Sequence, residues 1–192
     1  MTDTVRYLII AVVVACVAVW GCFKLYINAN GGTGRWKIKK VLKKAARIGG
    51  GKLICDKSFN GVDFEYVVTG DFGVILAESF CRSGELYGSY KDDTLKYVVK
   101  KKTLRVSNFT KVTAAQTELL RKLFQDNKVY NVKNIYSFTV YTQKDLAIFI
   151  NDMPGPLTYF KDFKKKVCQI QDHQMPGIDT GKLTSVVWDS LN

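Results

Sequence analysis

Segments with helical spacing and segments with extended spacing follow one another along residues 35–170. Apolar residues recur every three or four positions in residues 35–48, 110–126 and 157–171, which predicts three amphipathic helices. Short runs rich in apolar, β-branched and aromatic residues predict strands at residues 52–56, 66–69, 74–77, 94–106, 135–141 and 146–150. This order of elements predicts an α/β fold in which helices flank a mixed β-sheet.

A long uncharged segment precedes these elements. Residues 7–23 carry no charged side chain, and the apolar character continues beyond Lys24 to residue 27. About 20 helical residues, at a rise of 1.5 Å each, cross the roughly 30 Å of hydrocarbon in a bilayer. We therefore predict one transmembrane anchor at residues 7–27. The alternative is a cleaved secretory signal, which the length of the segment and the lack of a small-x-small site before Asn28 disfavour.

The anchor divides the chain into parts. Residues 28–34 are rich in Gly and Asn and predict a flexible linker. The 192 residues, of which 47% are hydrophobic, then suffice for one domain with its own core, which we place at residues 35–170. Residues 171–192 follow it as a C-terminal tail.

Basic residues are concentrated just after the anchor. The net charge is +12, and residues 1–55 account for +9 of it, with ten Lys or Arg and one acidic residue. This bias predicts that the amino terminus lies outside the membrane and the domain lies in the cytoplasm. Basic side chains of the first predicted helix would contact anionic lipid headgroups or nucleic acid. They are Lys37, Lys40, Lys44 and Arg47. A second cluster would face phosphates or protect a strand edge, and consists of Lys100, Lys101 and Lys102.

Two acidic residues flank a predicted hairpin. Residues 66–69 and 74–77 are joined by a glycine-rich turn, with Glu65 opening the first strand and Glu78 closing the second. A hairpin would bring these carboxylates together, and two carboxylates so placed bind a divalent metal such as Mg²⁺. Asp63 lies two residues before Glu65, on the same face of a regular strand, and is a further candidate ligand.

The segment 65–88, EYVVTGDFGVILAESFCRSGELYG, resembles the nuclease-related domain (NERD) family. Its members belong to the restriction-endonuclease-like group and carry an Asp on one strand and Glu-x-Lys on the next. Aligned on the turn glycine, Gly73, the Asp position falls on Glu65 and the triplet falls on residues 78–80. Residues 83–88 follow the family's Ser-Gly-x-x-x-Gly continuation. The resemblance spans about residues 34–167, and implies a restriction-endonuclease-like fold with Glu65 and Glu78 as catalytic metal ligands.

The chain departs from the family pattern at several positions. Phe80 occupies the Lys position, and an apolar ring cannot position the attacking water or stabilise charge on a phosphate. Arg82 would stabilise phosphate charge if the strand continued that far, but it stays protonated and cannot act as a base. The family's acidic residue in the first helix is missing after Gly34, and Val112 stands where a Gln is expected after an Asn.

Three functions follow from these patterns. The first is a membrane-anchored NERD-like domain with impaired catalysis, which binds nucleic acid or a protein partner at the cytoplasmic face of the membrane. The alternative is an active, divalent-metal-dependent nuclease that cleaves DNA or RNA phosphodiesters. A second alternative is a small membrane-anchored α/β protein unrelated to nucleases.

Overall fold

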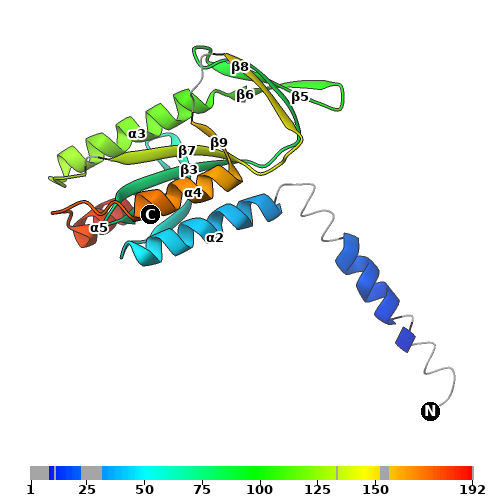
Figure 1. The fold of residues 1–192 in the computed structure, drawn as a ribbon, viewed down its shortest axis with the longest axis horizontal. Coiled ribbons are helices and arrows are strands. Elements are labelled where there is room, and N and C mark those ends of the chain that lie inside the picture. The colour runs from blue at the N-terminus through cyan, green and yellow to red at the C-terminus, as the bar shows by residue number, and fades with distance from the viewer. Residues whose placement is uncertain (1–8, 11, 23–31, 133, 152–155, 192) are drawn as a thin grey trace.

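The computed structural model describes residues 9–10, 12–22, 32–132, 134–151 and 156–191. After a helical segment at residues 9–10 and 12–22, the elements are α2 (Gly32–Ile48), β1 (Leu53–Phe59), β2 (Val62–Gly70), β3 (Gly73–Phe80), β4 (Gly84–Ser89), β5 (Thr94–Val99), β6 (Lys102–Ser107), α3 (Phe109–Asp126), β7 (Ile135–Tyr141), β8 (Leu146–Asn151), β9 (Leu157–Tyr159), α4 (Phe160–Gln171) and α5 (Thr180–Leu191). The expected α/β class is confirmed (Figure 1).

The expected membrane anchor lies only in part within the described residues. Residues 7–8, 11 and 23–27 of the anchor, and 28–31 of the linker, lie outside them. In the portion that the structure describes, no helix combines the length and apolar character needed to cross a bilayer.

The strands form two mixed sheets instead of the single sheet expected. The first has the order β1-β2-β3-β7-β9, and the second has the order β6-β5-β4-β8. The segment that forms β3 and β4 runs parallel to the segment that forms β7 and β8. In the first sheet β3 pairs with β7, and in the second sheet β4 pairs with β8. The registers are nearly the same, with Val74 opposite Ile135 in one sheet and Gly84 opposite Leu146 in the other. The two sheets are therefore joined by two parallel connections.

Helices cover both faces of the first sheet (Figure 1). On one face, α2 and α4 pack over a core that includes Leu42, Ile75 and Phe163. On the other face, α3 and α5 pack over a core that includes Leu76 and Leu120. Because successive side chains of a strand point to opposite faces, neighbouring residues such as Ile75 and Leu76 belong to different cores.

Several expected elements differ from the observed ones at their boundaries. The strands expected at residues 66–69 and 74–77 are longer, and residues 32–34 of the expected linker belong to α2. The strand expected at residues 94–106 is a hairpin, β5 and β6, which turns at Lys100 and Lys101, both with positive φ. The helix expected at residues 157–171 begins only at Phe160, because residues 157–159 form β9 and pair with β7. Strand β4 was not expected from its spacing.

The segment 171–192, expected as a tail, contains helix α5. Its residues Leu183, Val187 and Leu191 repeat every four positions, are buried, and belong to the core shared with α3. A buried hydrogen bond of 2.8 Å joins the hydroxyl of Thr184 to that of Thr69 on β2. Residues 180–191 are therefore packed as part of the domain.

Candidate functional site

The alternation of side chains on β2 changes phase at Glu65. Phe64 packs in the core with α3 and α5, yet Tyr66, two residues later, packs in the core with α2 and α4. The neighbouring strand, β1, is also irregular at this point, because Asp56 has a φ of 51°. Asp56 directly follows Cys55, which pairs with Tyr66. A regular strand would keep residues two apart on one face, so the expectation that Asp63 and Glu65 share a face does not hold here.

Glu65 lies on the α2 side of the sheet, where its carboxylate is fully engaged. It is 8% exposed, and Oε2 accepts a hydrogen bond of 2.6 Å from the backbone N–H of Ser79. Oε1 accepts a bond of 2.5 Å from the Ser79 hydroxyl, and Nε of Arg35 on α2 lies 3.0 Å from the same oxygen. Burial and the adjacent Glu65 charge raise the pKa of Tyr66. Through these contacts, the Glu65 side chain joins α2 to the β2–β3 hairpin.

Glu78 lies on the opposite, α3 side. Its Oε1 accepts hydrogen bonds from Nε2 of Gln116 at 2.6 Å and from the backbone N–H of Glu65 at 3.1 Å. Gln116 is 1% exposed and also donates to the carbonyl of Asp63 at 2.7 Å. Burial raises the pKa of the Glu78 carboxyl above its ordinary value, and the hydrogen bonds from Gln116 and Glu65 oppose that rise. The hairpin thus places the two carboxylates on different faces of the sheet.

A hollow of about 500 Å³ opens beside Glu78, between the end of β3, the end of β6 and the start of α3. We call it the Glu78 hollow. Asp63, Glu78, Arg82 and Thr139 line it. Two buried polar atoms near Glu78 have no hydrogen-bond partner among the described residues. They are Oε1 of Gln116 and Oγ1 of Thr139, and Thr139 is opposite Glu78 in the β3–β7 register. The structure therefore gathers three of the expected site residues, Asp63, Glu78 and Arg82, around the hollow, whereas Glu65 does not line it.

Phe80 joins the hydrophobic core between the second sheet and α3. It is 7% exposed, and its ring meets Tyr97 edge-on, with centroids 5.4 Å apart and an interplanar angle of 87°. It also meets Phe109, at 5.3 Å and 63°. Leu86 and Leu157 belong to the same core. The residue that the resemblance aligns with a lysine is thus a packing residue, and it also borders the Glu78 hollow.

The chemistry available in the Glu78 hollow is limited. Among the described residues, no three His, Cys, Asp or Glu side chains gather where a metal ion would bind. Asp63 and Glu78 are the carboxylates that line the hollow and would hold a divalent cation there. Arg82 is the cation that would stabilise charge on a bound phosphate.

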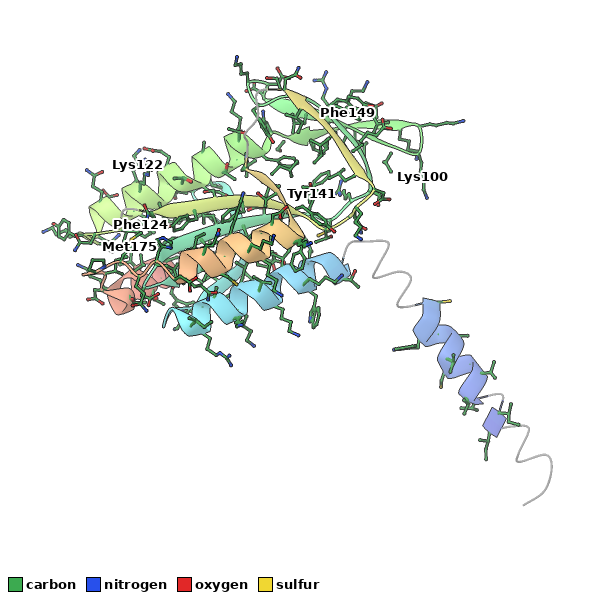
Figure 2. All side chains as sticks on the ribbon, in the orientation of Figure 1. Lys100, Lys122, Phe124, Tyr141, Phe149 and Met175 are labelled. Carbon is green, nitrogen blue, oxygen red and sulfur yellow. The ribbon has the colours of Figure 1, made fainter. Side chains whose placement is uncertain are left out.

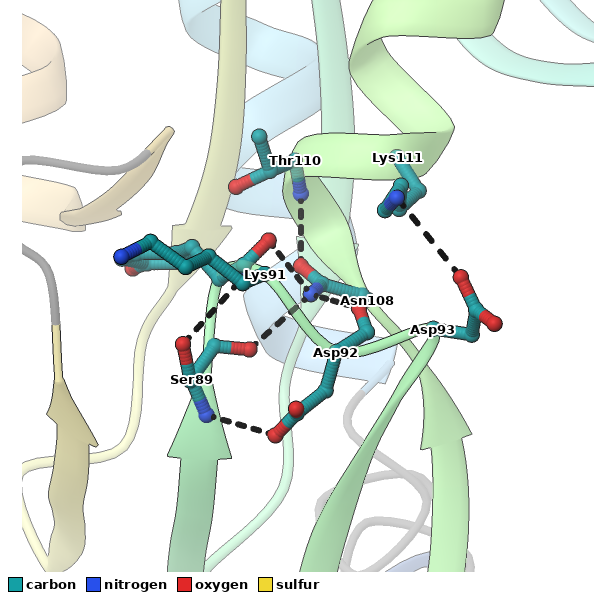
Figure 3. Close-up of polar contacts among 8 residues, drawn as sticks. Ser89, Lys91, Asp92, Asp93, Asn108, Thr110 and Lys111 are labelled. Atoms are coloured by element: carbon teal, nitrogen blue, oxygen red, sulfur yellow. Dashed lines mark hydrogen bonds and ion pairs between the residues drawn. The ribbon is translucent and has the colours of Figure 1, made fainter.

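Asn108 fixes the helix that carries Gln116 (Figure 3). It is fully buried, and its Oδ1 caps α3 by accepting a hydrogen bond of 3.1 Å from the N–H of Thr110. Its Nδ2 donates to the carbonyls of Ser89 at 3.2 Å, Tyr90 at 3.0 Å and Asp92 at 2.5 Å. One side chain therefore attaches the first turn of α3 to the loop after β4.

Gln116 and Arg35 were not predicted as site residues. Gln116 lies one helical turn after Val112, the position at which the resemblance places a Gln, so the same face of α3 carries the amide four residues later. Arg35 occupies the stretch where the family carries an acidic residue, and it lies against Glu65. A search along one helical turn in each direction would have found Gln116.

The predicted basic contact residues fall into two places. Lys40, Lys44 and Arg47 line a groove beside β1, and Lys37 is exposed on the same helix. Lys100, Lys101 and Lys102 lie at the exposed β5–β6 turn (Figure 2). Lys102 is four residues of extended strand from Val106, the first β6 residue that lines the Glu78 hollow, which is about 13 Å.

Comparisons with protein-family models, with curated proteins and with solved structures find no match to this chain.

Proposed function

We propose that this chain is a non-catalytic domain with a restriction-endonuclease-like core, held at the cytoplasmic face of a membrane, where it binds nucleic acid or a protein partner. One observation carries the proposal: Glu65 and Glu78, which a metal-dependent nuclease would need side by side, are engaged on opposite faces of the sheet. A metal site requires that its ligands converge on one point.

The contacts of Glu65 support the loss of catalysis. The carboxylate accepts hydrogen bonds from the N–H and hydroxyl of Ser79 and lies against Arg35. A divalent cation would have to displace all three donors from a buried group. Removing such partners leaves polar groups without hydrogen bonds, at a cost of about 1–3 kcal/mol each. Glu65 is therefore committed to structure.

Phe80 gives independent support. A nuclease of this kind uses a cation two residues after the Glu of β3, whereas here the position holds an aromatic ring packed against Tyr97 and Phe109. The ring cannot stabilise charge on a phosphate.

A residual nuclease is the second candidate, and the lining of the Glu78 hollow favours it. Asp63, Glu78 and Arg82 all border that hollow, which is large enough to admit a phosphate group. In this alternative, Asp63 and Glu78 would hold Mg²⁺ and Arg82 would stabilise the phosphate. The basic turn at residues 100–102 would take no part, because it lies far along β6 from the hollow.

A cleavage assay separates the two candidates. The purified full chain is incubated with single-stranded DNA, double-stranded DNA and RNA, in Mg²⁺ or Mn²⁺. We expect no cleavage. Glu78→Gln serves as the site variant, and Glu85→Gln, at an exposed residue of β4, is the matched control. Cleavage that is lost in Glu78→Gln and kept in Glu85→Gln would overturn the non-catalytic role.

The membrane location rests on residues 7–27 and on the basic residues that follow them. Cys168 is exposed on α4 and reports which side of the membrane holds the domain. We expect a membrane-impermeant maleimide to label Cys168 only after cells are lysed, with Cys168→Ser as the blank. Labelling of this residue in intact cells would refute the cytoplasmic location.

A further inference from the structure

A groove of about 970 Å³ runs beside β1, away from the Glu78 hollow. We call it the β1 groove. One wall is α2, which contributes Lys40, Lys43, Lys44 and Arg47, and the other side includes Trp188 of α5. Its floor includes residues 53–55 of β1. Because α2 and α5 cover opposite faces of the first sheet, the groove lies at the edge of the sheet between two helical layers.

The β1 groove is strongly basic. Besides the α2 residues, Lys39, Lys52 and Lys57 line it, so that seven cationic side chains surround one opening. None of these seven forms an ion pair with a carboxylate in the part of the chain that the structure describes. Lys52 instead lies over the ring of Trp188, with Nζ 4.7 Å from the centroid. Unpaired like charges at such a density repel one another, and an anionic ligand would relieve that repulsion.

The floor of the groove is a free strand edge. Within the part of the chain that the structure describes, β1 is the terminal strand of its sheet and pairs only with β2. A terminal strand presents backbone N–H and C=O groups that can pair with another extended segment. Leu53 and Cys55 face the α2 layer, and Ile54 faces the α5 layer, so the ladder is regular at these three residues. Three residues are enough in this fold, since β9 pairs with β7 over three positions.

We propose that the β1 groove binds an extended acidic segment of a partner protein, which pairs with β1 as an additional strand. This inference rests on the proposed binding role and specifies its partner class. The bound segment would alternate, with Asp or Glu facing α2 and apolar residues facing Trp188.

The spacing of the α2 cations matches such a segment. Lys39 and Lys43, Lys40 and Lys44, and Lys43 and Arg47 are each four residues apart, which is a rise of about 6 Å along the helix. Side chains on one face of a strand repeat every 6.6–6.8 Å, roughly. The repeat of acidic residues along an added strand is therefore close to the repeat of cations along α2. Trp188 is 40% exposed and offers apolar contact to the intervening residues.

Two other polyanions fit the β1 groove less well. A bilayer surface is flat, whereas the sheet edge is recessed between α2 and α5. A nucleic-acid strand would use the cations, but it gains nothing from a free strand edge, and Trp188 is the one aromatic residue in the described lining. Base stacking on a row of aromatic rings is the usual feature of single-strand binding.

Fluorescence anisotropy of labelled peptides with the full chain tests the inference. The probe alternates Glu and Val, one control peptide has the same composition with the acids grouped, and another is N-methylated at alternate amides. N-methylation keeps the charge but removes the donors that strand pairing needs. We expect the alternating probe to bind, and both control peptides to bind at least about tenfold more weakly, because they lose register or backbone pairing.

Protein variants locate the site. Lys40→Glu with Lys44→Glu should weaken binding of the alternating probe by about tenfold or more, because two attractive contacts become repulsive. Lys164→Glu with Lys165→Glu makes the same charge change on exposed residues of α4 and should leave binding unchanged.

Competition by other anions gives the overturning outcomes. Equal binding of the N-methylated peptide, or stronger binding of a thymidine oligonucleotide than of the alternating probe, would refute strand addition. Absence of probe binding would also refute strand addition. It would not affect the proposed non-catalytic role, which the cleavage assay tests separately.

Discussion

Replacing Phe80 by Lys introduces the residue type that the resemblance to nucleases places at this position, and we expect it to damage the fold. The ring is 7% exposed and packs edge-on against Tyr97 and Phe109. Removing a buried Phe side chain costs about 3–5 kcal/mol. The new ammonium group can extend along its own methylenes into the Glu78 hollow, so we add no cost for burying its charge. The loss is a large part of a typical total stability of about 5–15 kcal/mol.

Urea unfolding of the full chain in mild detergent, followed by tryptophan fluorescence, measures this loss. Phe149→Lys is the matched control, because Phe149 is 54% exposed on the second sheet, where it stacks on Tyr87. It should cost about 0.5–1.5 kcal/mol, the value of an aromatic pair. If Phe80→Lys destabilises the chain no more than Phe149→Lys does, the packing role of Phe80 is refuted.

Three further predictions concern the Glu78 carboxyl, the start of α2 and the cap of α3. Burial raises the pKa of Glu78 in the folded chain above the ordinary 4.5, so its contribution to stability is present below that pH and is lost as the pH rises through the folded value. Between mildly acidic and neutral pH, the melting temperature of Glu78→Gln should fall less steeply than that of the wild-type chain. Identical profiles of melting temperature against pH would contradict this. Gly34→Ala would place a Cβ 2.5 Å from Sγ of Cys81 and should lower the free energy of unfolding in urea by about 1–3 kcal/mol. The control is Gly21→Ala, whose added Cβ would have no atom within 4 Å and should change the free energy of unfolding little. Equal effects of the two substitutions would exclude the clash. Asn108→Ala removes the cap of α3 and the three contacts that Nδ2 donates, and should lower the free energy of unfolding by about 3 kcal/mol. Asn108→Ser can still cap the helix and should recover about 1 kcal/mol of this loss in the same measurement. No loss in either variant would show that the Asn108 side chain does not hold α3 in place.

Amphipathic helices and the central hairpin could be predicted from the sequence. In α2 and α3, apolar residues recur at helical spacing, and this spacing decides which face is buried. The turn glycine Gly73 has a φ of 99°, as a turn between β2 and β3 requires. These features depend on residues close in sequence, so a local pattern is sufficient to reveal them.

The geometry of the candidate site could not be predicted in the same way. Alternation along an ideal strand places Asp63 and Glu65 on one face, but the backbone irregularity at Asp56 and Glu65 changes the phase. This irregularity depends on how two neighbouring strands pair. The Gln116–Glu78 hydrogen bond joins residues 38 apart in sequence, so its existence depends on where α3 packs.

Helix α5 was missed although its signal was present. Leu183, Val187 and Leu191 are four residues apart, which is the spacing of a buried helical stripe. The segment is short and follows a Pro-Gly pair, and both features favour a loop at the end of a domain. Only packing against β1 and β2 shows that the stripe has a surface to cover.

The paired parallel connections between the sheets bear on how the chain folds. Val74 and Ile135 are 61 residues apart, and Gly84 and Leu146 are 62 apart, so both sheets depend on long-range pairings of almost equal sequence separation. Closing a flexible loop of this length costs roughly 3.6 kcal/mol in chain entropy, beyond a constant. Once β7 has paired with β3, β8 already lies close to β4. The second sheet therefore requires no separate closure of a chain loop of comparable length. One search thus organises both sheets, and we expect them to form in a single cooperative transition.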